Sequence, residues 1–440
     1  MQKKYNFKDK LLNKINKKNI TVGVIGLGYV GLPLSIQYAL KKINTIGFDI
    51  DSSKIKSINK GKSYIKQINN DEIKKTKKYL TASKDFRLIK MCDVIVVCLP
   101  TPLKNNFIPN LEYITKTINV IKKYIREGQM ISLESTSYPG TTEDLIYKKF
   151  YKKFDIGKNL FICFSPERED PGNKKYKNIN VPKIVSGITP ECLKIAKSFY
   201  LLVFKSIVPV ASTKTAEFTK LLENIYRSVN IGLVNEMKII AKLMNVNIHE
   251  VIRAASTKPF GFKAFYPGPG MGGHCIPIDP FYMSWKSKQL GYAPKFIENA
   301  GKINSIMPKW TVKQILNNFK SRKIKLINQK ILIVGVAYKK NIDDTRESPA
   351  LEIMNILKNK NINFDYHDPY IKILQSVRKY SFKKKSITLN KINLKKYAAI
   401  IIVTDHDKIN YKKILLYSNI VFDCRGALDH FSTRQNIINI

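Results

Sequence analysis

The sequence predicts an α/β protein in which two doubly wound halves flank a helical middle. The first half opens with a β-branched run over 20–26 that leads through spaced glycines into a helical apolar pattern. Between about 213 and 244, apolar residues recur at helical spacing without a proline, and a second alternation of strands and helices starts at 330. Such alternation is typical of parallel sheets, which bind ligands at the carboxyl ends of their strands.

Length and composition indicate a soluble protein of several domains. At 440 residues the chain exceeds the ~150 residues of an average domain, so we expect two or three. The N-terminus is charged, and no apolar run approaches the ~20 residues that span a bilayer. We therefore expect no signal peptide, no membrane insertion and a cytoplasmic location. Six widely spaced cysteines, with no Cys-x-x-Cys pair, fit a reducing compartment and predict no metal site.

The charge balance is strongly basic: 77 Lys and Arg residues against 33 Asp and Glu give a formal net charge of +44. This excess is typical of proteins that bind nucleic acid or an anionic membrane. However, the lysines are spread along the whole chain among many isoleucines and asparagines. We interpret them as a compositional bias of the surface that attracts anionic substrates, and we expect no nucleic-acid partner.

A dinucleotide-binding pattern joins the first strand to the first helix of this alternation. Gly26, Gly28 and Gly31 form G-x-G-x-x-G, with Tyr29 and Val30 inside it. At such a junction the glycines permit a tight turn, close approach of a pyrophosphate to backbone N–H groups, and close packing of helix on strand. We predict that these five residues contact a dinucleotide.

The acid that such a unit requires follows its second strand. Residues 45–49 read as a short strand that ends at Asp49, and Lys54 follows five residues later. A carboxylate at this place hydrogen-bonds the adenosine ribose hydroxyls, which favours NAD over NADP. We therefore predict NAD as the cofactor and include Asp49 and Lys54 in its site.

Two further strands of the first half end in polar turns. The strand near 94–99 leads to Thr101, and the strand over 130–133 leads to Ser135 and Thr136. Each of these residues alone is more typical of a helix cap or a turn. Because carboxyl ends of parallel strands share one edge of the sheet, together they are expected to line the nicotinamide side of the cofactor site.

Charged and amide side chains follow in the next segments. A strand over 160–164 ends in Ser-Pro-Glu-Arg, which carries Glu167 and Arg168. On the long helix, Lys220 and Asn224 are four residues apart and so share one face. Such a pair is ordinarily solvated, but after a dinucleotide domain we interpret it as catalytic. The helix, about 48 Å long at 1.5 Å per residue, is long enough to bridge two domains or form a subunit interface.

A loop of glycines and prolines over 266–279 contains Cys275, with His274 beside it and Asp279 four residues later. We expect its four glycines to let the backbone approach a ligand rather than to serve packing. The cysteine is either a small buried hydrophobe in a tight turn or a nucleophile whose thiolate the neighbours favour. The dinucleotide pattern and the lysine–asparagine pair favour the nucleophile.

The C-terminal half reads as Rossmann-like but lacks the glycine pattern, since Gly335 stands alone after the strand that begins at 330. A helix is predicted from 349 to about 358. This half either binds a nucleotide through other contacts, such as Lys339 and Arg346, or is purely structural. Further strands are predicted near 363–366, 398–402 and 420–423, and the preceding domain boundary near 318–330.

These motifs together resemble the UDP-glucose/GDP-mannose dehydrogenase family. The resemblance covers nearly the whole chain, follows the family's order and is therefore specific. It is carried by Gly26-Leu-Gly-Tyr-Val-Gly-Leu-Pro33, Glu134-Ser-Thr136, Ser165-Pro-Glu167, Lys220-x-x-x-Asn224, Gly272-Gly-His-Cys-Ile-Pro-Ile-Asp279 and Ala337-Tyr-Lys-Lys-Asn-Ile-Asp-Asp-Thr-Arg-Glu-Ser348.

The resemblance implies three domains and an oxidoreductase activity. An NAD-binding Rossmann domain is expected over 1–205, a central helical domain that forms a homodimer over 206–320, and a UDP-sugar-binding domain over 321–440. Members oxidise the C6 alcohol of a nucleotide sugar to a carboxylate, consuming two NAD⁺. Polysaccharide biosynthesis, as of O-antigen, is the expected use of the product.

Within the family, the turn after Glu134, the segment after Ser165 and the histidine before the cysteine look most like the branch acting on UDP-N-acetylhexosamines. UDP-N-acetylglucosamine is the expected substrate, with UDP-N-acetylmannosamine and UDP-N-acetylgalactosamine as alternatives. Many UDP-glucose enzymes carry a second glutamate four residues after the one matched by Glu167. This chain has Pro171 there, which speaks against UDP-glucose.

The resemblance also implies roles for the site residues. Cys275 would add to the sugar aldehyde as a thiohemiacetal and then carry a thioester that water hydrolyses. Lys220 and Asn224 would stabilise the oxyanion, and Lys220 would share proton transfer with Asp279. Glu167 is the expected base for hydrolysis, through a water held by Thr136, and Arg346 is expected to reach the cofactor or the active site. The expected substrate contacts are Glu167, Arg168, Lys220, Asn224, Phe265, Tyr266, Gly272, Gly273 and Lys339.

Three other classes of protein remain as alternatives. A single-hydride β-hydroxyacid dehydrogenase of the 6-phosphogluconate type also pairs a helical lysine with an asparagine, but it needs neither the cysteine nor a second α/β domain. A basic nucleic-acid-binding protein would bind duplex DNA tightly and with strong salt dependence. Neither this class nor a redox-sensing NAD-binding module explains Lys220, Asn224, Cys275 and Asp279 together.

Overall fold

The chain folds into two compact units. In the computed structural model, unit 1 comprises Met1–Glu223 and Phe281–Tyr292, and unit 2 comprises Asn224–Pro280 and Ala293–Ile440. The structure describes residues 6–65, 68–104, 107–168, 178–273, 276–326, 328–374, 380–431 and 436–440.

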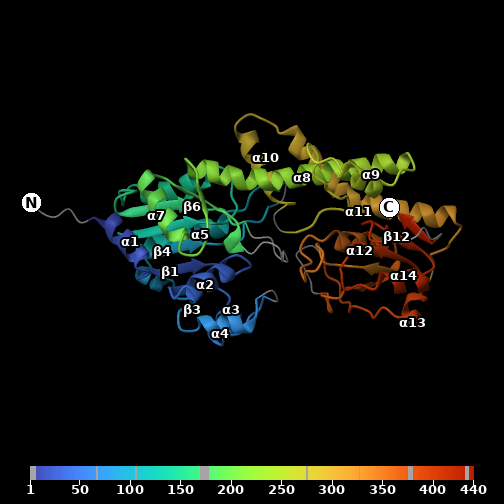
Figure 1. The fold of residues 1–440 in the computed structure, drawn as a ribbon, viewed down its shortest axis with the longest axis horizontal. Coiled ribbons are helices and arrows are strands. Elements are labelled where there is room, and N and C mark those ends of the chain that lie inside the picture. The colour runs from blue at the N-terminus through green and yellow to red at the C-terminus, as the bar shows by residue number, and fades with distance from the viewer. Residues whose placement is uncertain are drawn as a thin grey trace, which may run out of the picture. The chain divides into compact units, whose positions relative to one another are not determined.

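Unit 1 is built on an eight-stranded sheet in the order β3-β2-β1-β4-β5-β6-β7-β8 (Figure 1). The order reverses between β1 and β4, and that reversal marks the ligand-binding crevice of a doubly wound sheet. The elements of this part are α1 (Phe7–Asn16), β1 (Thr21–Ile25), α2 (Gly31–Leu40), β2 (Asn44–Phe48), α3 (Ser52–Asn59), α4 (Asn70–Thr76), β3 (Leu80–Ser83), η1 (Phe86–Met91), β4 (Val94–Val97), α5 (Glu112–Tyr124), β5 (Gln129–Leu133), η3 (Thr142–Tyr147), α6 (Lys148–Phe150), β6 (Leu160–Phe164), η4 (Asn178–Asn180), β7 (Lys183–Gly187), α7 (Pro190–Tyr200) and β8 (Ile207–Pro209).

Apolar side chains cover both faces of this sheet, as its central strands require. On one face, residues of α1, α2 and α7 pack on β1 and β4, with the rings of Tyr38 and Phe199 stacked 4.8 Å apart. On the other face, Ile118 of α5 and Phe150 of α6 pack on β5 and β6. The predicted parallel sheet is present from β3 to β6, and β7, a strand that the sequence analysis did not predict, runs antiparallel to β6.

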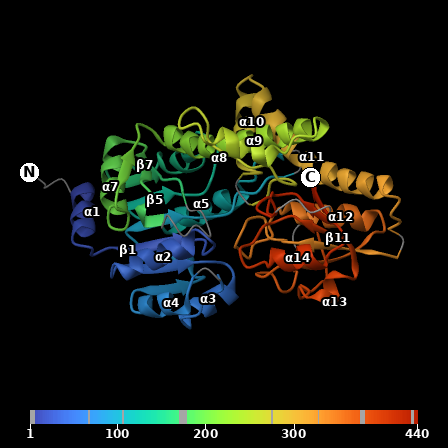
Figure 2. The ribbon, with the colours of Figure 1, turned by 45° about the vertical axis from the view of Figure 1, so that its right-hand side comes forward.

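Unit 2 contains most of the long helix α8 and a five-stranded parallel sheet in the order β10-β9-β11-β12-β13. Figure 2 shows β11 of this sheet with α12 and α14 near it. The predicted helix near 213–244 is present as α8. No helix among the described residues has the length and apolar content needed to cross a bilayer. The remaining elements are α8 (Thr213–Leu243), α9 (Ile248–Ala255), α10 (Asp279–Gln289), α11 (Lys295–Ser321), β9 (Lys330–Val334), α12 (Pro349–Asn359), β10 (Asn363–His367), α13 (Lys391–Leu394), β11 (Tyr397–Ile402), α14 (Tyr411–Tyr417), β12 (Val421–Asp423) and β13 (Ile437–Asn439).

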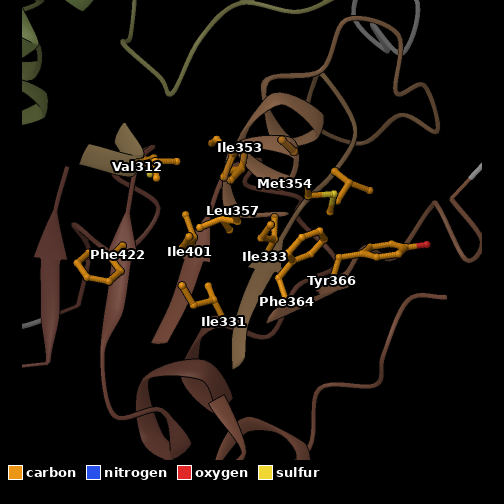
Figure 3. Packing of buried hydrophobic residues seen from close by; sticks show 14 of the residues in the cluster. Val312, Ile331, Ile333, Ile353, Met354, Leu357, Phe364, Tyr366, Ile401 and Phe422 are labelled. Atoms are coloured by element: carbon orange, nitrogen blue, oxygen red, sulfur yellow. The ribbon is translucent and has the colours of Figure 1, made fainter. Parts of the chain in front are cut away.

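The core of unit 2 lies between its sheet and helices α11 and α12. Figure 3 shows Ile333 of β9 and Ile401 of β11 beneath Ile353 and Leu357 of α12, all fully buried. Trp310 of α11 packs against the same cluster. These parallel strands are buried on both faces, which accounts for their continuous apolar sequence. The predicted fold class, an α/β protein with a helical middle, is therefore confirmed.

A buried carboxylate closes the carboxyl edge of the second sheet. Asp368 follows β10, as Asp49 follows β2 in unit 1, but its side chain is fully buried. One oxygen accepts the ring N–H of His406, whose other ring nitrogen accepts from Asn341 N. The backbone donors to the two Asp368 oxygens are Val336 N, Ala337 N, Tyr370 N and Ile371 N. Five donors occupy all the acceptor positions of a carboxylate, so Asp368 has a structural role and has no position left for a ribose hydroxyl.

We expect Asp368→Asn to destabilise unit 2 by about 2–4 kcal/mol, because either amide orientation faces its NH₂ toward two backbone N–H donors. Denaturant unfolding should be followed by the fluorescence of Trp310, in a Trp285→Phe background that leaves one tryptophan. Asp365→Asn is the matched control, since Asp365 lies on β10, the strand that Asp368 follows, and its side chain is partly exposed. Asp365→Asn should lower the free energy of unfolding by less than about 1 kcal/mol. Equal losses of stability in the two variants would contradict the structural role of Asp368.

The same substitution should change the dependence of stability on pH. Burial alone raises the pKa of Asp368, but the hydrogen bond from His406 and the backbone donors outweigh it, so the net pKa is lowered. A carboxyl with a depressed folded pKa contributes its full stability above the unfolded value of about 3.9, and loses it as pH falls through the folded pKa. The difference in the free energy of unfolding between wild type and Asp368→Asn should therefore become smaller below about pH 4.

Candidate active site

The glycine loop of unit 1 leaves space at one position and fills the others. Gly26 has φ +93°, and a Cβ there would lie 2.4 Å from Cys98 O. A Cβ on Gly31 would lie 2.0 Å from Gly26 O, whereas a Cβ on Gly28 would meet no atom within 4 Å. Gly26 and Gly31 are therefore required by packing, and Gly28 faces open space beside the first turn of α2. This arrangement fits a pyrophosphate against the N-terminus of that helix.

The carboxylate of Asp49 supports this loop and retains room for a ligand. Its Oδ2 accepts from Leu27 N at 2.9 Å and from Lys54 Nζ at 3.1 Å, and its Oδ1 accepts from Asp51 N at 2.9 Å. A carboxylate offers about four acceptor positions, so these three hydrogen bonds leave one for a ribose hydroxyl. Tyr64 also donates to Leu27 O. The residues of this edge fit NAD, with Gly28 at the pyrophosphate and Asp49 and Lys54 at the ribose.

The other predicted cofactor residues lie along the same edge of the sheet. Tyr29 is 37% exposed, Val30 is half-buried, and Thr101 is buried with its carbonyl accepting from Tyr282 of α10 at 3.0 Å. Ser135 Oγ accepts from Leu99 N at 2.8 Å and so ties the end of β5 to the end of β4. Ser135 therefore has a structural role that the sequence did not indicate; its contact with the cofactor stays a prediction.

Two buried glutamates share one buried lysine beside these strand ends. Lys183 Nζ on β7 lies 2.7 Å from Glu134 Oε2, directly after β5, and 3.3 Å from Glu167 Oε2, after β6. The other oxygen of Glu134 accepts from Tyr200 of α7 at 2.7 Å. Burial raises the pKa of Glu134; the charge of Lys183 opposes this rise, and that of Glu167 adds to it. We call these three residues the Glu134–Lys183–Glu167 cluster.

Helix α8 joins this cluster through Lys220, whose Nζ donates to Glu167 O. The Glu167 carboxylate also accepts from Arg168 N at 2.8 Å, and the Arg168 guanidinium pairs with Glu223 of α8. One turn before Lys220, Glu217 accepts from the backbone of 140 and 142, and burial raises its pKa to about 7. Lys220 is thus held against the backbone that presents Glu167. Thr136 is half-buried in the turn after Glu134.

One turn further along α8, Asn224 belongs to unit 2 and contacts Asp279. Asn224 is fully buried; its amide donates to Asp279 Oδ2, and its oxygen accepts from Arg227. Asp279 is the first residue of α10 and is buried. An amide fixed between a cation and a carboxylate keeps one orientation, which suits a group that must present a donor to a ligand.

The glycines of the loop over 266–273 pack against protein, which corrects the expectation that they serve only a ligand. Gly273 has φ +95°, and its N–H donates to Arg346 O at 3.1 Å. A Cβ on Gly272 or Gly273 would lie 2.6 or 2.9 Å from Tyr338. A Cβ on Gly268 would lie 2.6 Å from Arg425. Cys275 and His274 lie outside the described residues, as does Pro171.

Polar side chains of unit 2 fix the start of this loop. Gly268 N donates to Asn235 of α8 at 3.0 Å, and the Asn235 amide donates to Asn304 of α11 at 2.9 Å. Tyr266 is 48% exposed and stacks on His249. The neighbouring Phe265, half-buried, meets the ring of Tyr226 edge to face.

Lys339 and Arg346 both lie in the segment between β9 and α12. Lys339 is half-buried. Arg346 pairs with Asp344 through two nitrogens, and 40% of its side chain is exposed. Its predicted reach to the cofactor stays a prediction.

Sequence reasoning missed several members of these networks. Lys183 is a lone lysine at the start of a buried strand, a signal that was available but not used. Glu217 and Asn235 lie seven and eleven residues from Asn224, on the same helical face, so polar periodicity along α8 would have found them. Glu134 was seen only as part of a turn.

Comparison with known proteins supplies the family. Three models of the UDP-glucose/GDP-mannose dehydrogenase family match the chain in order: its NAD binding domain over 20–204, its central domain over 214–306 and its UDP binding domain over 332–430. The two domain boundaries expected above, 205/206 and 320/321, stay predictions.

Whole-length relatives agree with this match. The chain is 31% identical to the UDP-N-acetyl-D-glucosamine 6-dehydrogenase of Pseudomonas aeruginosa, over 94% of the chain and 98% of the relative. It is 32% identical to the UDP-N-acetyl-D-mannosamine dehydrogenase of Methanococcus aeolicus, over 98% and 96%. The solved UDP-D-ManNAc dehydrogenase of Pyrococcus horikoshii superposes with a TM-score of 0.85 at 29% identity, over 96% and 99%. The chain therefore belongs to the UDP-glucose/GDP-mannose dehydrogenase family of NAD-dependent oxidoreductases.

Proposed function

We propose that this enzyme oxidises the C6 alcohol of a UDP-N-acetylhexosamine to the uronic acid, with UDP-N-acetylglucosamine as the first candidate substrate. The relatives named above act on the gluco and manno epimers, which supports the acetylated sugar and leaves UDP-N-acetylmannosamine as an alternative. UDP-N-acetylgalactosamine is the third candidate. The product would feed synthesis of a surface polysaccharide.

The observation that carries this proposal is the polar face of α8. Lys220 and Asn224 lie one turn apart, and both are buried. Lys220 contacts the backbone of Glu167, and Asn224 contacts the carboxylate of Asp279. A cation and an amide on successive turns, each next to an acid, supply two donors for an oxyanion and two groups for proton transfer.

The mechanism assigns one task to each group. NAD, when bound, accepts a hydride in each of two oxidation steps. Asp279 and Lys220 take the proton of the C6 hydroxyl, and Lys220 with Asn224 stabilises the negative charge that develops on that oxygen. Cys275 adds to the aldehyde carbon and keeps the intermediate bound until it is a thioester.

Hydrolysis of the thioester is assigned to Glu167. Its carboxylate takes a proton from the attacking water while the water oxygen bonds to the thioester carbon, and the cysteine leaves as a thiolate. Thr136, in the turn that follows Glu134, is assigned to hold this water.

The first test is the yield of NADH per sugar. We expect two NADH per mole from one of UDP-N-acetylglucosamine, UDP-N-acetylmannosamine and UDP-N-acetylgalactosamine, with UDP-glucose as the comparison. The reason is that oxidation of an alcohol to an acid removes two hydrides. Absorbance at limiting sugar, with the product identified by mass spectrometry, measures this yield.

The Cys275→Ala variant is the control for that test. It should form no acid and still bind NAD with unchanged affinity. One NADH per sugar from the wild type, together with full turnover by Cys275→Ser, would instead indicate a single-hydride β-hydroxyacid dehydrogenase.

Asp49→Ala should weaken NAD binding by about 10- to 100-fold, because a hydrogen bond to a charged group contributes about 1.5–3 kcal/mol. Binding of the UDP-sugar should change less than twofold. Calorimetry with each ligand separately measures both affinities. Asp51→Ala is the matched control, since Asp51 only caps α3 through Ser53 and is exposed. Equal weakening of both ligands would remove Asp49 from the ribose site.

We also propose that the enzyme is a homodimer through α8. Its exposed face carries a row of large apolar side chains that are three, four or seven residues apart, as on one side of a helix. A row of this size on a 31-residue helix is typical of an interface between copies of a chain. The row consists of Phe218, Leu222, Tyr226, Leu233, Met237 and Ile240, each at least 41% exposed.

The double substitution Leu233→Glu/Ile240→Glu should convert the dimer into monomers, because two buried charges per chain would face the partner's apolar row. Sedimentation should give wild type at twice the 50.5 kDa of one chain. Leu416→Glu, on α14 and 61% exposed, is the matched control and should remain dimeric. A monomeric wild type, or a double variant that stays dimeric, would contradict an α8 interface.

A further inference from the structure

The Glu134–Lys183–Glu167 cluster has one feature that the assigned mechanism does not use: a buried ammonium shared by two carboxylates. The Lys183 side chain is 1% exposed, and those of Glu134 and Glu167 are 0% and 8% exposed. When both carboxylates are ionised, the three groups carry a net charge of −1 in the protein interior, where charges interact far more strongly than in water. Loss or gain of a single proton here therefore changes the local field substantially.

The geometry gives the two carboxylates unequal shares of the lysine. Glu134 is the closer partner at 2.7 Å, and Tyr200 holds its second oxygen. Glu167 is 3.3 Å from the same ammonium, and its second oxygen accepts from Arg168 N. Both carboxylates therefore have a partner on each oxygen, but Glu134 lies closer to the ammonium than Glu167 does. The more distant carboxylate is the one that the proposed mechanism requires to bind a proton.

Other charged and titratable groups face this cluster from the surrounding elements. The rings of Tyr200 and Phe204 lie 5.4 and 5.1 Å from the ammonium, which favours its charged form. Burial lowers the pKa of Lys183, but Glu134 and Glu167 outweigh this, so the net pKa is raised. Within the part of the chain that the structure describes, further titratable groups near the cluster are Cys98 after β4, Tyr38 of α2, Lys220 of α8 and the Arg168–Glu223 pair.

We propose that Lys183 is a positioning residue for Glu167, and that Glu134 sets how much of the lysine's charge Glu167 feels. This inference rests on the proposed role of Glu167 in hydrolysis. Lys183 aims the Glu167 carboxylate and lowers its basicity. Glu134 offsets that charge and restores the basicity, so that a carboxylate beside a buried cation still accepts a proton.

The proton step balances within the cluster. Before hydrolysis the three groups carry −1. When Glu167 accepts the proton of the attacking water, the water oxygen bonds to the thioester carbon, the C–S bond breaks, and the cysteine takes the negative charge as a thiolate. The cluster is then neutral, with Lys183 paired to Glu134 alone. Glu167 afterwards releases the proton to solvent, and the cluster returns to −1.

The test is the pH dependence of thioester hydrolysis in three variants. Enzyme in excess is mixed with NAD and UDP-N-acetylglucosamine, or with whichever sugar gives two NADH, and loss of the covalent adduct is followed by intact-protein mass spectrometry. Glu134→Gln should move the acid limb of the hydrolysis rate to lower pH by about one unit or more, because Glu167 then has the lysine to itself. Lys183→Met should move it to higher pH by a similar amount. Lys183→Met/Glu134→Gln should return it near wild type.

Asp93→Asn is the matched control for loss of a buried acid. Asp93 is 4% exposed, pairs with Lys14 at 2.7 Å, and precedes β4 at the opposite edge of the same sheet. The acid limb of the hydrolysis rate of Asp93→Asn should stay at the wild-type pH. Lys183→Arg should keep the acid limb at the wild-type pH and retain most of the hydrolysis rate. If Lys183→Met does not fold, the isosteric Glu134→Gln alone decides the question.

The outcomes separate this inference from the mechanism on which it rests. Glu167→Gln should accumulate the covalent adduct; rapid hydrolysis in that variant would remove Glu167 as the base and the proposed mechanism with it. If Glu167→Gln accumulates adduct but Glu134→Gln leaves the acid limb in place, the mechanism stands and the cluster has only a structural role. If the acid limb of hydrolysis moves to lower pH in Glu134→Gln and to higher pH in Lys183→Met, Glu134 and Glu167 share the charge of Lys183 as proposed.

Discussion

Helix α8 buries a row of polar side chains and exposes a row of large apolar ones, and the candidate site depends on the buried polar row. The buried amides and charges each satisfy a loop that carries function, because an unpaired polar group in that position would cost several kcal/mol. The helix therefore fixes the loops as much as they fix the helix. Four of its buried polar residues and their partners are Glu217 with the backbone of 140 and 142, Lys220 with Glu167, Asn224 with Asp279, and Asn235 with Gly268.

The glycine-rich loop shows that flexibility is not what its glycines provide. Gly268, Gly272 and Gly273 are each pressed against a side chain of unit 2, so a methyl group at any of them would displace Arg425 or Tyr338. Asn235 and Arg346 O hold the backbone at both ends of this stretch. A side chain attached to such a loop starts from a rigid backbone, so it is held in one position and does not adjust to different ligands.

Sequence reasoning predicted the long-range plan well and the local networks poorly. The strands before Gly26 and Gly335 and the uninterrupted α8 follow from periodicity, because burial on two faces or on one stripe leaves a direct pattern. The antiparallel β7 was missed, since strand direction depends on how the chain returns to the sheet. Lys183 and Glu134 were missed because a charge becomes buried only when a partner from a distant segment meets it, and no local pattern records that meeting.

The two sheets share one local arrangement, a glycine and an aspartate at the ends of neighbouring strands, but the aspartate has a different role in each. In both, a glycine with positive φ follows the first strand and an aspartate follows the second, yet Asp49 keeps an acceptor position while Asp368 gives all of its own to five donors. For protein engineering, this asymmetry means that adding glycines after β9 would not create a second dinucleotide site. The hydrogen bond between His406 and Asp368 would first have to break, and the C-terminal sheet would then lose a buried hydrogen bond at the carboxyl ends of its strands.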